Sequence, residues 1–217
     1  SIRQTRGVLD IPKTCPVCGS PTVVVESEAS STKTLHCTNH ECPAKQLRKF
    51  ARFVSKPGVN MDGIAEQTLQ RFINLGWIKD FSDIYSIPDH AAEIARLDGF
   101  GDKSANNIVE SVSKARDVDA QRLLYALCIP LCGQDVCKRL LAAHKLEDLM
   151  KIVRGEDNAG SLFAPDKVAI LSAIPGIGPE KARQFVAWFE NEANIKVYDK
   201  LMSEVNIKQA QPASVGE

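Results

Sequence analysis

The chain has 217 residues, of which 44% are hydrophobic and 25% are charged, and its formal net charge is zero. These fractions are typical of a folded protein and exclude a mostly disordered chain. No apolar run approaches the roughly 20 residues of a membrane span, and the first residues lack the apolar stretch of a secretory signal. Aromatic residues make up only 6%, which favours helices over a β-sandwich. The first residue is Ser rather than Met, as expected for a piece of a longer protein.

The zero net charge conceals an uneven distribution. Residues 1–57 contain nine Lys and Arg against four Asp and Glu, so the remaining 160 residues carry 18 basic and 23 acidic side chains. A basic surface over the whole protein, as expected for strong nucleic-acid binding, is therefore absent. Any contact with phosphates must come from local patches or from backbone N–H groups.

Four of the seven cysteines form two close pairs near the N-terminus, Cys15 with Cys18 and Cys37 with Cys42. Zinc binds four thiolates in a tetrahedron, and two tight turns that each present two thiolates supply this set. An odd number of cysteines without an export signal argues against a disulfide framework. The spacing therefore predicts one closed, structural zinc site held by these four residues.

The segment between the two cysteine pairs predicts a β-hairpin. Thr22–Glu26 is rich in β-branched residues, Lys33–His36 is a candidate return strand, and Ser27–Thr32 forms a polar turn between them. His36 and His40 are zinc ligands by chemical type and compete with the cysteines for the metal. A module of roughly 50 residues with few large apolar side chains needs such a metal to fold.

A helix is predicted directly after the last cysteine. Pro43 suits the first helical position, and apolar residues recur at helical spacing from Leu47 to Val54. Basic residues occupy the other positions and form either a solvated face or a stripe that contacts phosphates. These residues are Lys45, Arg48, Lys49 and Arg52.

From residue 57 onward a short motif recurs. Two clear copies, at 99–105 and 176–182, read Gly-apolar-Gly-x-x-x-Ala and lie between apolar stretches with helical spacing. Two weaker copies lie at 63–65, where Ala65 replaces the second glycine, and at 131–133, where Leu131 replaces the first. The pattern predicts four helix–hairpin–helix units, each a tight turn between two helices.

The chemistry of such a turn suits phosphate binding. The first glycine permits a positive φ, and the apolar residue fills the angle between the helices. The second glycine lets a phosphate approach the bare N-terminus of the second helix. The alternative is that the turns are connections only. A nucleotide-binding loop of the type G-x-G-x-x-G is excluded, because neither clear copy has the third glycine or follows a strand. The predicted DNA-binding residues here are Gly63, Gly99, Gly101, Lys103, Gly133, Gly176, Gly178 and Lys181.

Three further cysteines, Cys128, Cys132 and Cys137, are interpreted as small buried residues rather than as a second metal site. Cys137 occupies the position that Ala105 and Ala182 fill in the clear copies of the motif. We find no nucleophile with a neighbouring base and no carboxylate pair spaced for acid–base catalysis.

A four-cysteine finger followed at once by four helix–hairpin–helix motifs resembles the C-terminal half of bacterial NAD-dependent DNA ligase, over roughly residues 8–206. In that family the finger binds structural zinc, and the hairpins grip the minor groove and backbone around a nick in DNA. The segments that carry the resemblance are Cys15–Ser20, Cys37–Asn39, Cys42–Ala44, Met61–Gly63, Asp80–Tyr85, Leu97–Gly101 and Ile174–Gly178.

Other features of that family are missing from this chain. Its adenylation domain carries a Lys-x-Asp-Gly nucleophile, whereas Asn60 stands two residues before Asp62 here. Neither the OB-fold expected before the finger nor the BRCT domain expected after the hairpins is found. The resemblance thus implies a non-catalytic fragment, with NAD used by the parent enzyme and not bound by this chain. Cys128 and Pro130 depart from the family's Gly-rich third hairpin, which puts DNA binding by that hairpin in doubt.

The expected fold is mainly α, with a small four-Cys zinc finger and β-hairpin (1–56), a compact domain of four helix–hairpin–helix motifs and about ten short helices (57–206), and a linker (207–217). The expected function is the binding of nicked duplex DNA for nick sealing in replication and repair, by a cytoplasmic monomer that does not contact membranes. Two rivals stay open: a protein-interaction scaffold, and a helix–hairpin–helix subunit of another DNA-repair factor.

Overall fold

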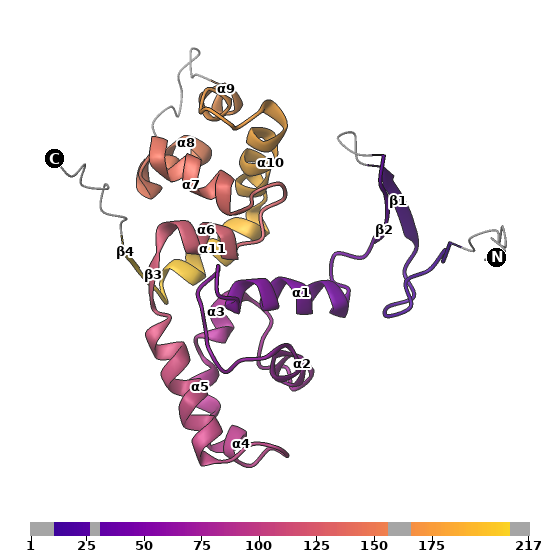
Figure 1. Cartoon of the computed structure of the whole chain (residues 1–217), viewed down its shortest axis with the longest axis vertical. Coiled ribbons are helices and arrows are strands. Elements are labelled where there is room, and N and C mark those ends of the chain that lie inside the picture. The colour runs from indigo at the N-terminus through magenta and orange to yellow at the C-terminus, as the bar shows by residue number, and fades with distance from the viewer. Residues whose placement is uncertain (1–10, 27–30, 156–165, 209–217) are drawn as a thin grey trace, which may run out of the picture. The chain divides into compact units, whose positions relative to one another are not determined.

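The computed structural model describes residues 11–26, 31–155 and 166–208, and the chain divides into two compact units, 1–48 and 49–217 (Figure 1). The described residues contain eleven α-helices, one short 3₁₀ helix and four strands, so the predicted mainly α fold is confirmed. None of the helices in these ranges is long and apolar enough to cross a membrane.

The first unit contains the predicted β-hairpin. Strand β1 (Thr22–Glu26) pairs antiparallel with β2 (Lys33–Cys37), and Val24 lies opposite Leu35. Part of the predicted turn, residues 27–30, lies outside the described residues. The apolar side chains on both faces of this hairpin are exposed, so the hairpin has no apolar core of its own.

Helix α1 (Pro43–Val54) begins at a proline, as predicted, and carries residues of both units. Its C-terminal half packs into the second unit, where the ring of Phe53 stacks on Phe81 with the centroids 4.7 Å apart. Phe50 meets the same ring edge-on at 5.8 Å. The units therefore divide between Arg48 and Lys49 rather than after residue 56, because these aromatic side chains belong to the second core.

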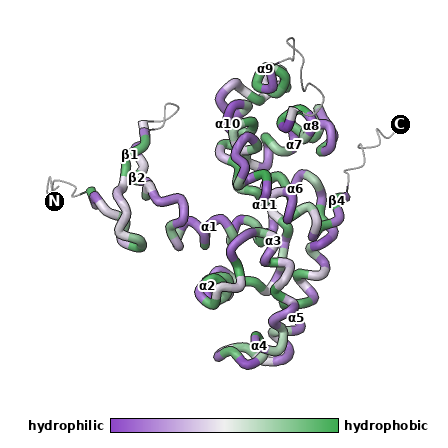
Figure 2. The backbone as a smooth tube through the Cα atoms, turned by 180° about the vertical axis from the view of Figure 1, so that it is seen from behind, coloured by the Kyte–Doolittle hydropathy of each residue, from purple (hydrophilic) through white to green (hydrophobic). Residues whose placement is uncertain are grey.

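The second unit is built from short helices that alternate hydrophobic and hydrophilic residues (Figure 2). Their apolar faces share one core rich in Leu, Ile, Val and Phe. The elements after α1 are α2 (Glu66–Asn74), α3 (Phe81–Ile84), η1 (Ile87–His90), α4 (Ala91–Ala95), α5 (Asp102–Lys114), β3 (Asp117–Asp119), α6 (Ala120–Ala126), α7 (Gln134–Ala143), α8 (Leu146–Arg154), α9 (Lys167–Ser172), α10 (Pro179–Glu190), α11 (Glu192–Met202) and β4 (Asn206–Lys208).

Helices that are neighbours in the sequence pack as pairs: α4 with α5, α6 with α7, and α9 with α10. Contacts between α10 and α8, between α10 and α11, and between α11 and α3 join these pairs into one body. Within this unit, α4 and α5 lie at one end and α8, α9 and α10 at the other (Figure 1).

A short parallel pairing of β3 with β4 brings the end of the described chain back to its middle, with Val118 opposite Ile207. Arg116 supports this closure, because its guanidinium donates to the backbone oxygens of Tyr85 and Glu204. The predicted linker therefore starts later than expected: Ile207 and Lys208 belong to β4, and residues 209–217 lie outside the described residues.

All four predicted hairpin turns share one backbone conformation. The first motif position has a positive φ in every copy, at +84° in Gly63, +82° in Gly99, +58° in Leu131 and +84° in Gly176. The apolar residue that follows is buried in three copies and half-buried in the second, where it is Phe100. The repeat is thus one of backbone geometry, because the third turn has the same positive φ although Leu131 stands in place of the first glycine.

Leu131 is the strained member of this set. A left-handed conformation costs an L-residue about 1–2 kcal/mol. Its side chain is 50% exposed and recovers little of that cost by burial. The third turn is consequently stabilised by its surroundings rather than by its own sequence.

We therefore expect Leu131→Gly to raise the free energy of unfolding by about 1 kcal/mol, because glycine adopts this φ without strain. Leu75 is the matched control, since it is 48% exposed but has an ordinary φ of −76°. Leu75→Gly should lower stability by about 0.5–1 kcal/mol. Urea unfolding midpoints of the two variants measure this, and equal losses in both would show that Leu131 stores no strain.

Candidate metal centre and nucleic-acid interface

The structure gathers the four predicted zinc ligands. The Sγ atoms of Cys15 and Cys42 lie 3.9 Å apart and those of Cys18 and Cys37 lie 3.4 Å apart. All four sulfurs lie within 4.8 Å of one another. Zinc–sulfur bonds of about 2.3 Å in a tetrahedron place sulfurs about 3.8 Å apart, so the cluster fits a zinc ion.

Two tight turns create this arrangement. In the first, the amide of Cys15 donates to the Ser20 carbonyl at 2.7 Å, and Gly19 adopts a φ of +73° to reverse the chain. In the second, the amide of Asn39 donates to the Cys37 sulfur at 3.4 Å. Hydrogen bonds from amides to a sulfur favour its thiolate form, which is the form that binds metal.

The thiols of the cluster differ in their pKa values. Hydrogen bonds from the side chain and backbone of Ser20 lower the pKa of the Cys18 thiol to about 6. The Asn39 amide lowers the pKa of Cys37, but burial and the neighbouring thiols outweigh it and raise this pKa to about 11. Thiolates held this close repel one another, and a cation among them removes that repulsion.

Neither competing histidine joins the cluster. The Nε2 of His36 lies 2.9 Å from the Thr34 hydroxyl, and His36 and His40 are both exposed. Among the described residues, the four cysteines form the one group of metal-ligating side chains that could hold an ion.

In the second unit, each hairpin turn leads to a helix N-terminus that no side chain caps. The residues that precede α2, α5, α7 and α10 have extended backbones and make no side-chain hydrogen bond to these helices; they are Ala65, Gly101, Gly133 and Gly178. A Cβ added at any of the three glycines would meet nothing within 4 Å. The N-termini of α5, α7 and α10 are thus open to a ligand in front of their glycines, and in α10 the first free donors are the amides of Glu180 and Lys181, because Pro179 has no N–H group.

Charges beside these termini differ between copies. Lys103 and Lys181 are exposed in the first turns of α5 and α10, and neither forms an ion pair within the described part of the chain. Each has an acidic neighbour, Asp102 or Glu180, which offsets its charge. In the first turn of α7 stands Asp135, and no lysine accompanies it there.

The predicted basic stripe on α1 divides by role. Arg48 is exposed, whereas the ammonium of Lys45 donates to the Cys37 carbonyl within the first unit. In the second unit the Lys49 ammonium lies 4.8 Å from the centroid of the Phe81 ring.

Arg52 is engaged inside the second unit. Its guanidinium donates to the backbone oxygens of Tyr125 and Cys132, at 3.1 and 2.9 Å, and lies 4.1 Å from the centroid of the Tyr125 ring. These contacts give Arg52 a structural role at the third hairpin, and its contact with phosphate stays a prediction.

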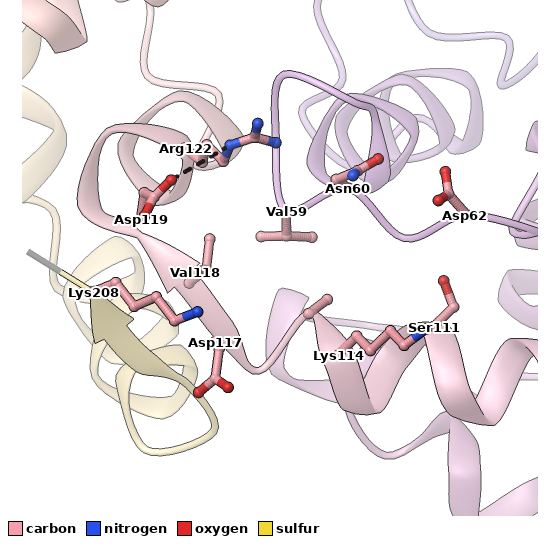
Figure 3. A pocket seen from close by; sticks show the side chains of 11 residues that line it. Val59, Asn60, Asp62, Ser111, Lys114, Asp117, Val118, Asp119, Arg122 and Lys208 are labelled. Atoms are coloured by element: carbon pink, nitrogen blue, oxygen red, sulfur yellow. Dashed lines mark ion pairs between the residues drawn. The ribbon is translucent and has the colours of Figure 1, made fainter. Parts of the chain in front are cut away.

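A pocket of about 320 Å³ that the sequence did not predict lies between the first hairpin, the end of α5, β3 and β4 (Figure 3). Its charged side chains are partly satisfied already: Arg122 pairs with Asp119 at 3.7 Å, and Lys114 pairs with Glu110 at 2.9 Å. Acidic and basic groups are mixed along its wall, together with the hydroxyl of Ser111.

Comparison with known proteins identifies relatives of the whole chain, although no protein-family model matches it. It is 36% identical to the DNA ligase of Lachnoclostridium phytofermentans over 211 residues, 97% of this chain and 30% of that protein. It is 35% identical to the DNA ligase of Ruminiclostridium cellulolyticum over 205 residues, 94% of this chain and 29% of that protein. The chain is homologous to a segment of bacterial DNA ligases.

The chain spans less than a third of the length of the DNA ligases that it matches. Because the similarity covers 94% or more of the chain, it includes both units, and the cysteine cluster and the hairpins lie in one homologous segment. The expected resemblance to a DNA ligase fragment is thus confirmed.

The three later cysteines are buried or half-buried, as predicted for packing residues. Cys132 and Cys137 place their sulfurs 3.4 Å apart, and the sulfur of Cys128 donates to the Lys49 carbonyl at 3.5 Å. Cys137 is fully buried, like Ala105 and Ala182 at the matching positions of the clear motif copies.

We expect one zinc ion per chain and its loss in Cys37→Ser, because a hydroxyl is a poor replacement for a thiolate ligand. Hydrogen exchange of the β-hairpin should then rise to that of unfolded peptide, while the circular dichroism of the helices changes little. Elemental analysis after gentle purification measures the metal. Cys128→Ser is the matched control and should retain zinc. A wild-type chain that folds without any metal contradicts the assignment.

Proposed function

We propose that the chain is the DNA-binding segment of an NAD-dependent DNA ligase. In this role the finger holds structural zinc, and the hairpins grip the backbone and minor groove of nicked duplex DNA for nick sealing in replication and repair. The observation that carries the proposal is the set of four uncapped helix N-termini, three of which have open space in front of a glycine. Homology to DNA ligases supplies the class of substrate.

The proposed binding uses dipoles more than charges. A helix N-terminus has the effect of about half a positive charge, and its free N–H groups donate directly to phosphate oxygens. This explains how a chain with 27 basic and 27 acidic side chains can bind a polyanion. Contacts of this kind position the protein but read no sequence, which suits an enzyme that must act at any nick.

We propose that bond formation belongs to other domains of the parent enzyme. The adenylation domain would carry the nucleophile and use NAD, and the OB-fold and BRCT domains would complete the polypeptide. In this view the chain itself is a monomer without catalytic activity and acts with its parent enzyme in the bacterial cytoplasm. Its residues bind and orient the nicked duplex so that the two strand ends are held for joining.

The rival hypothesis is that the hairpins are connectors in a protein-interaction scaffold. A connector is expected to place a Ser, Thr, Asp or Asn side chain at the N-termini that it creates, because glycine there is less favourable by a few tenths of a kcal/mol. Gly101, Gly133 and Gly178 do neither, which favours a ligand in that space. A gel shift with nicked duplex DNA distinguishes the two functions directly.

Affinity for nicked duplex should fall with ionic strength, because bound phosphates release their counterions. If Lys103, Lys181 and one cation of α1 neutralise phosphates, the slope of log K against log salt should be about −3. Fluorescence anisotropy of labelled nicked duplex between about 50 and 200 mM salt measures this slope. A flat dependence would exclude binding to the backbone.

Gly101→Ala and Gly178→Ala should each weaken binding of nicked duplex about tenfold, equivalent to about 1.4 kcal/mol, because a Cβ blocks the close approach of phosphate. Neither change should unfold the protein, since the new Cβ meets nothing within 4 Å and the φ angles are ordinary, −141° and −76°. The loss should be equal for DNA of different sequences.

The reciprocal variant, Ala65→Gly, is the control. It removes the Cβ that the first hairpin already has, so it should leave binding unchanged or strengthen it. Circular dichroism confirms that each variant is folded. Wild-type affinity in folded Gly101→Ala and Gly178→Ala would make the hairpins connectors and the scaffold the better hypothesis.

A further inference from the structure

Two arginines occupy the same position in alternate copies of the hairpin motif. Arg71 lies six residues after Ala65, and Arg139 lies six residues after Gly133. Ala65 and Gly133 precede α2 and α7, the second helices of the first and third hairpins. The second and fourth hairpins have uncharged amides at this position, Asn107 and Gln184.

Each arginine reaches the next hairpin at the same point. Arg71 donates through Nη1 to the carbonyl of Asp98 at 2.5 Å, and Arg139 donates through Nη1 to the carbonyl of Pro175 at 3.0 Å. Asp98 and Pro175 are the residues directly before the first glycine of the second and fourth hairpins. The same bond is therefore made twice, from the first hairpin to the second and from the third to the fourth.

Further contacts fix both guanidinium groups. That of Arg71 lies 5.4 Å from the centroid of the Phe100 ring, the apolar plug of the second hairpin. That of Arg139 donates through Nε to Asp135 at 2.8 Å. It also lies against Gly176, where an added Cβ would come within 2.5 Å of Nη1. The planar guanidinium suits this use, because it donates in several fixed directions at once.

The arginines and the glycines are distributed in a complementary way. The hairpins that supply an arginine have each lost one glycine, to Ala65 and to Leu131. The hairpins that receive it keep both glycines and carry Lys103 or Lys181 in the next helical turn. A bond to the carbonyl before the positive-φ glycine holds the peptide from which the turn starts, and so sets the direction of the N–H groups that follow it.

We propose that Arg71 and Arg139 are positioning residues that hold the second and fourth hairpins in the orientation that binds phosphate. The first and third hairpins then act mainly as supports for their partners. The inference rests on the proposed function, because it assigns an order of importance among hairpins that bind DNA. It also makes the fold a duplication of one working unit, a supporting hairpin bonded to a binding hairpin.

The test is a set of double-mutant cycles measured as affinity for nicked duplex DNA in the full chain. Arg71→Ala and Arg139→Ala should each weaken binding about fivefold to tenfold. Arg139→Ala should cause no further loss in Gly178→Ala but its full loss in Gly101→Ala. Arg71→Ala should cause no further loss in Gly101→Ala but its full loss in Gly178→Ala. Mutations of residues that act through a shared group have non-additive effects on the binding free energy, whereas the effects of mutations at distant sites add.

A direct contact between arginine and phosphate predicts something different. Each Arg→Ala change would then lower the salt slope by about one and would add to both glycine variants, and either result overturns the proposal. Lys138→Ala is the matched control, because it removes a positive charge one residue before Arg139 from an exposed side chain. It should weaken binding less than Arg139→Ala, and equal losses would contradict a positioning role.

A readout without DNA separates this inference from the proposed function. Amide hydrogen exchange at residues 99–103 should accelerate at least threefold in Arg71→Ala, and exchange at 176–180 should do so in Arg139→Ala, with no change at the other hairpin. If Gly101→Ala and Gly178→Ala bind DNA normally, the proposed function fails. The exchange rates still test whether the arginine hydrogen bonds hold the two hairpins. Unchanged exchange in both arginine variants overturns the positioning role itself.

Discussion

The structure of the second unit depends on one backbone constraint, a positive φ at the start of each hairpin turn. At Gly63, Gly99 and Gly176 the constraint costs little, and at Leu131 it is met in spite of a side chain. The turn directs the chain so that the next residue is buried in three copies and half-buried in the second. The second helix then begins without a capping side chain, so one local angle sets both the packing of the helix pair and the exposure of its N–H groups.

The two units are stabilised by different physical means. The first has an exposed β-hairpin and draws its order from turns that place four sulfurs together, which is how a small module without a core uses a metal. The second buries a continuous set of aliphatic and aromatic side chains and closes through β3, β4 and Arg116. Loss of metal and loss of core packing are therefore expected to be separate events.

Arginine has two roles in the second unit beyond surface charge. Arg52 and Arg116 each donate to two backbone oxygens and tie distant segments together. Arg71 and Arg139 each donate to one backbone oxygen, that of the residue before the first glycine of the next hairpin. A guanidinium can satisfy carbonyls that a turn leaves unpaired, and its charge keeps the remaining donors hydrated at the surface. A count of basic residues therefore overestimates the charge that is free to meet a phosphate.

Short-range patterns by themselves determined the four-cysteine cluster, the β-hairpin of the first unit, the start of α1 at Pro43 and the four hairpin turns. These features arise from neighbouring residues and from the steric demands of glycine, proline and thiolate ligands, which sequence spacing expresses directly. The resemblance to a DNA ligase segment, which homology confirms, rested on the same local motifs in their order along the chain.

Tertiary structure alone decided the features that need residues far apart in the chain. Helical spacing placed Arg52 in a basic stripe, yet its partners Tyr125 and Cys132 lie more than 70 residues away. The strand at Asn206–Lys208 forms only because Asp117–Asp119 lies beside it. The units divide within α1 because the rings of Phe50 and Phe53 pack against Phe81. Leu131 adopts a glycine's conformation because packing over the whole unit outweighs the local preference of a single residue.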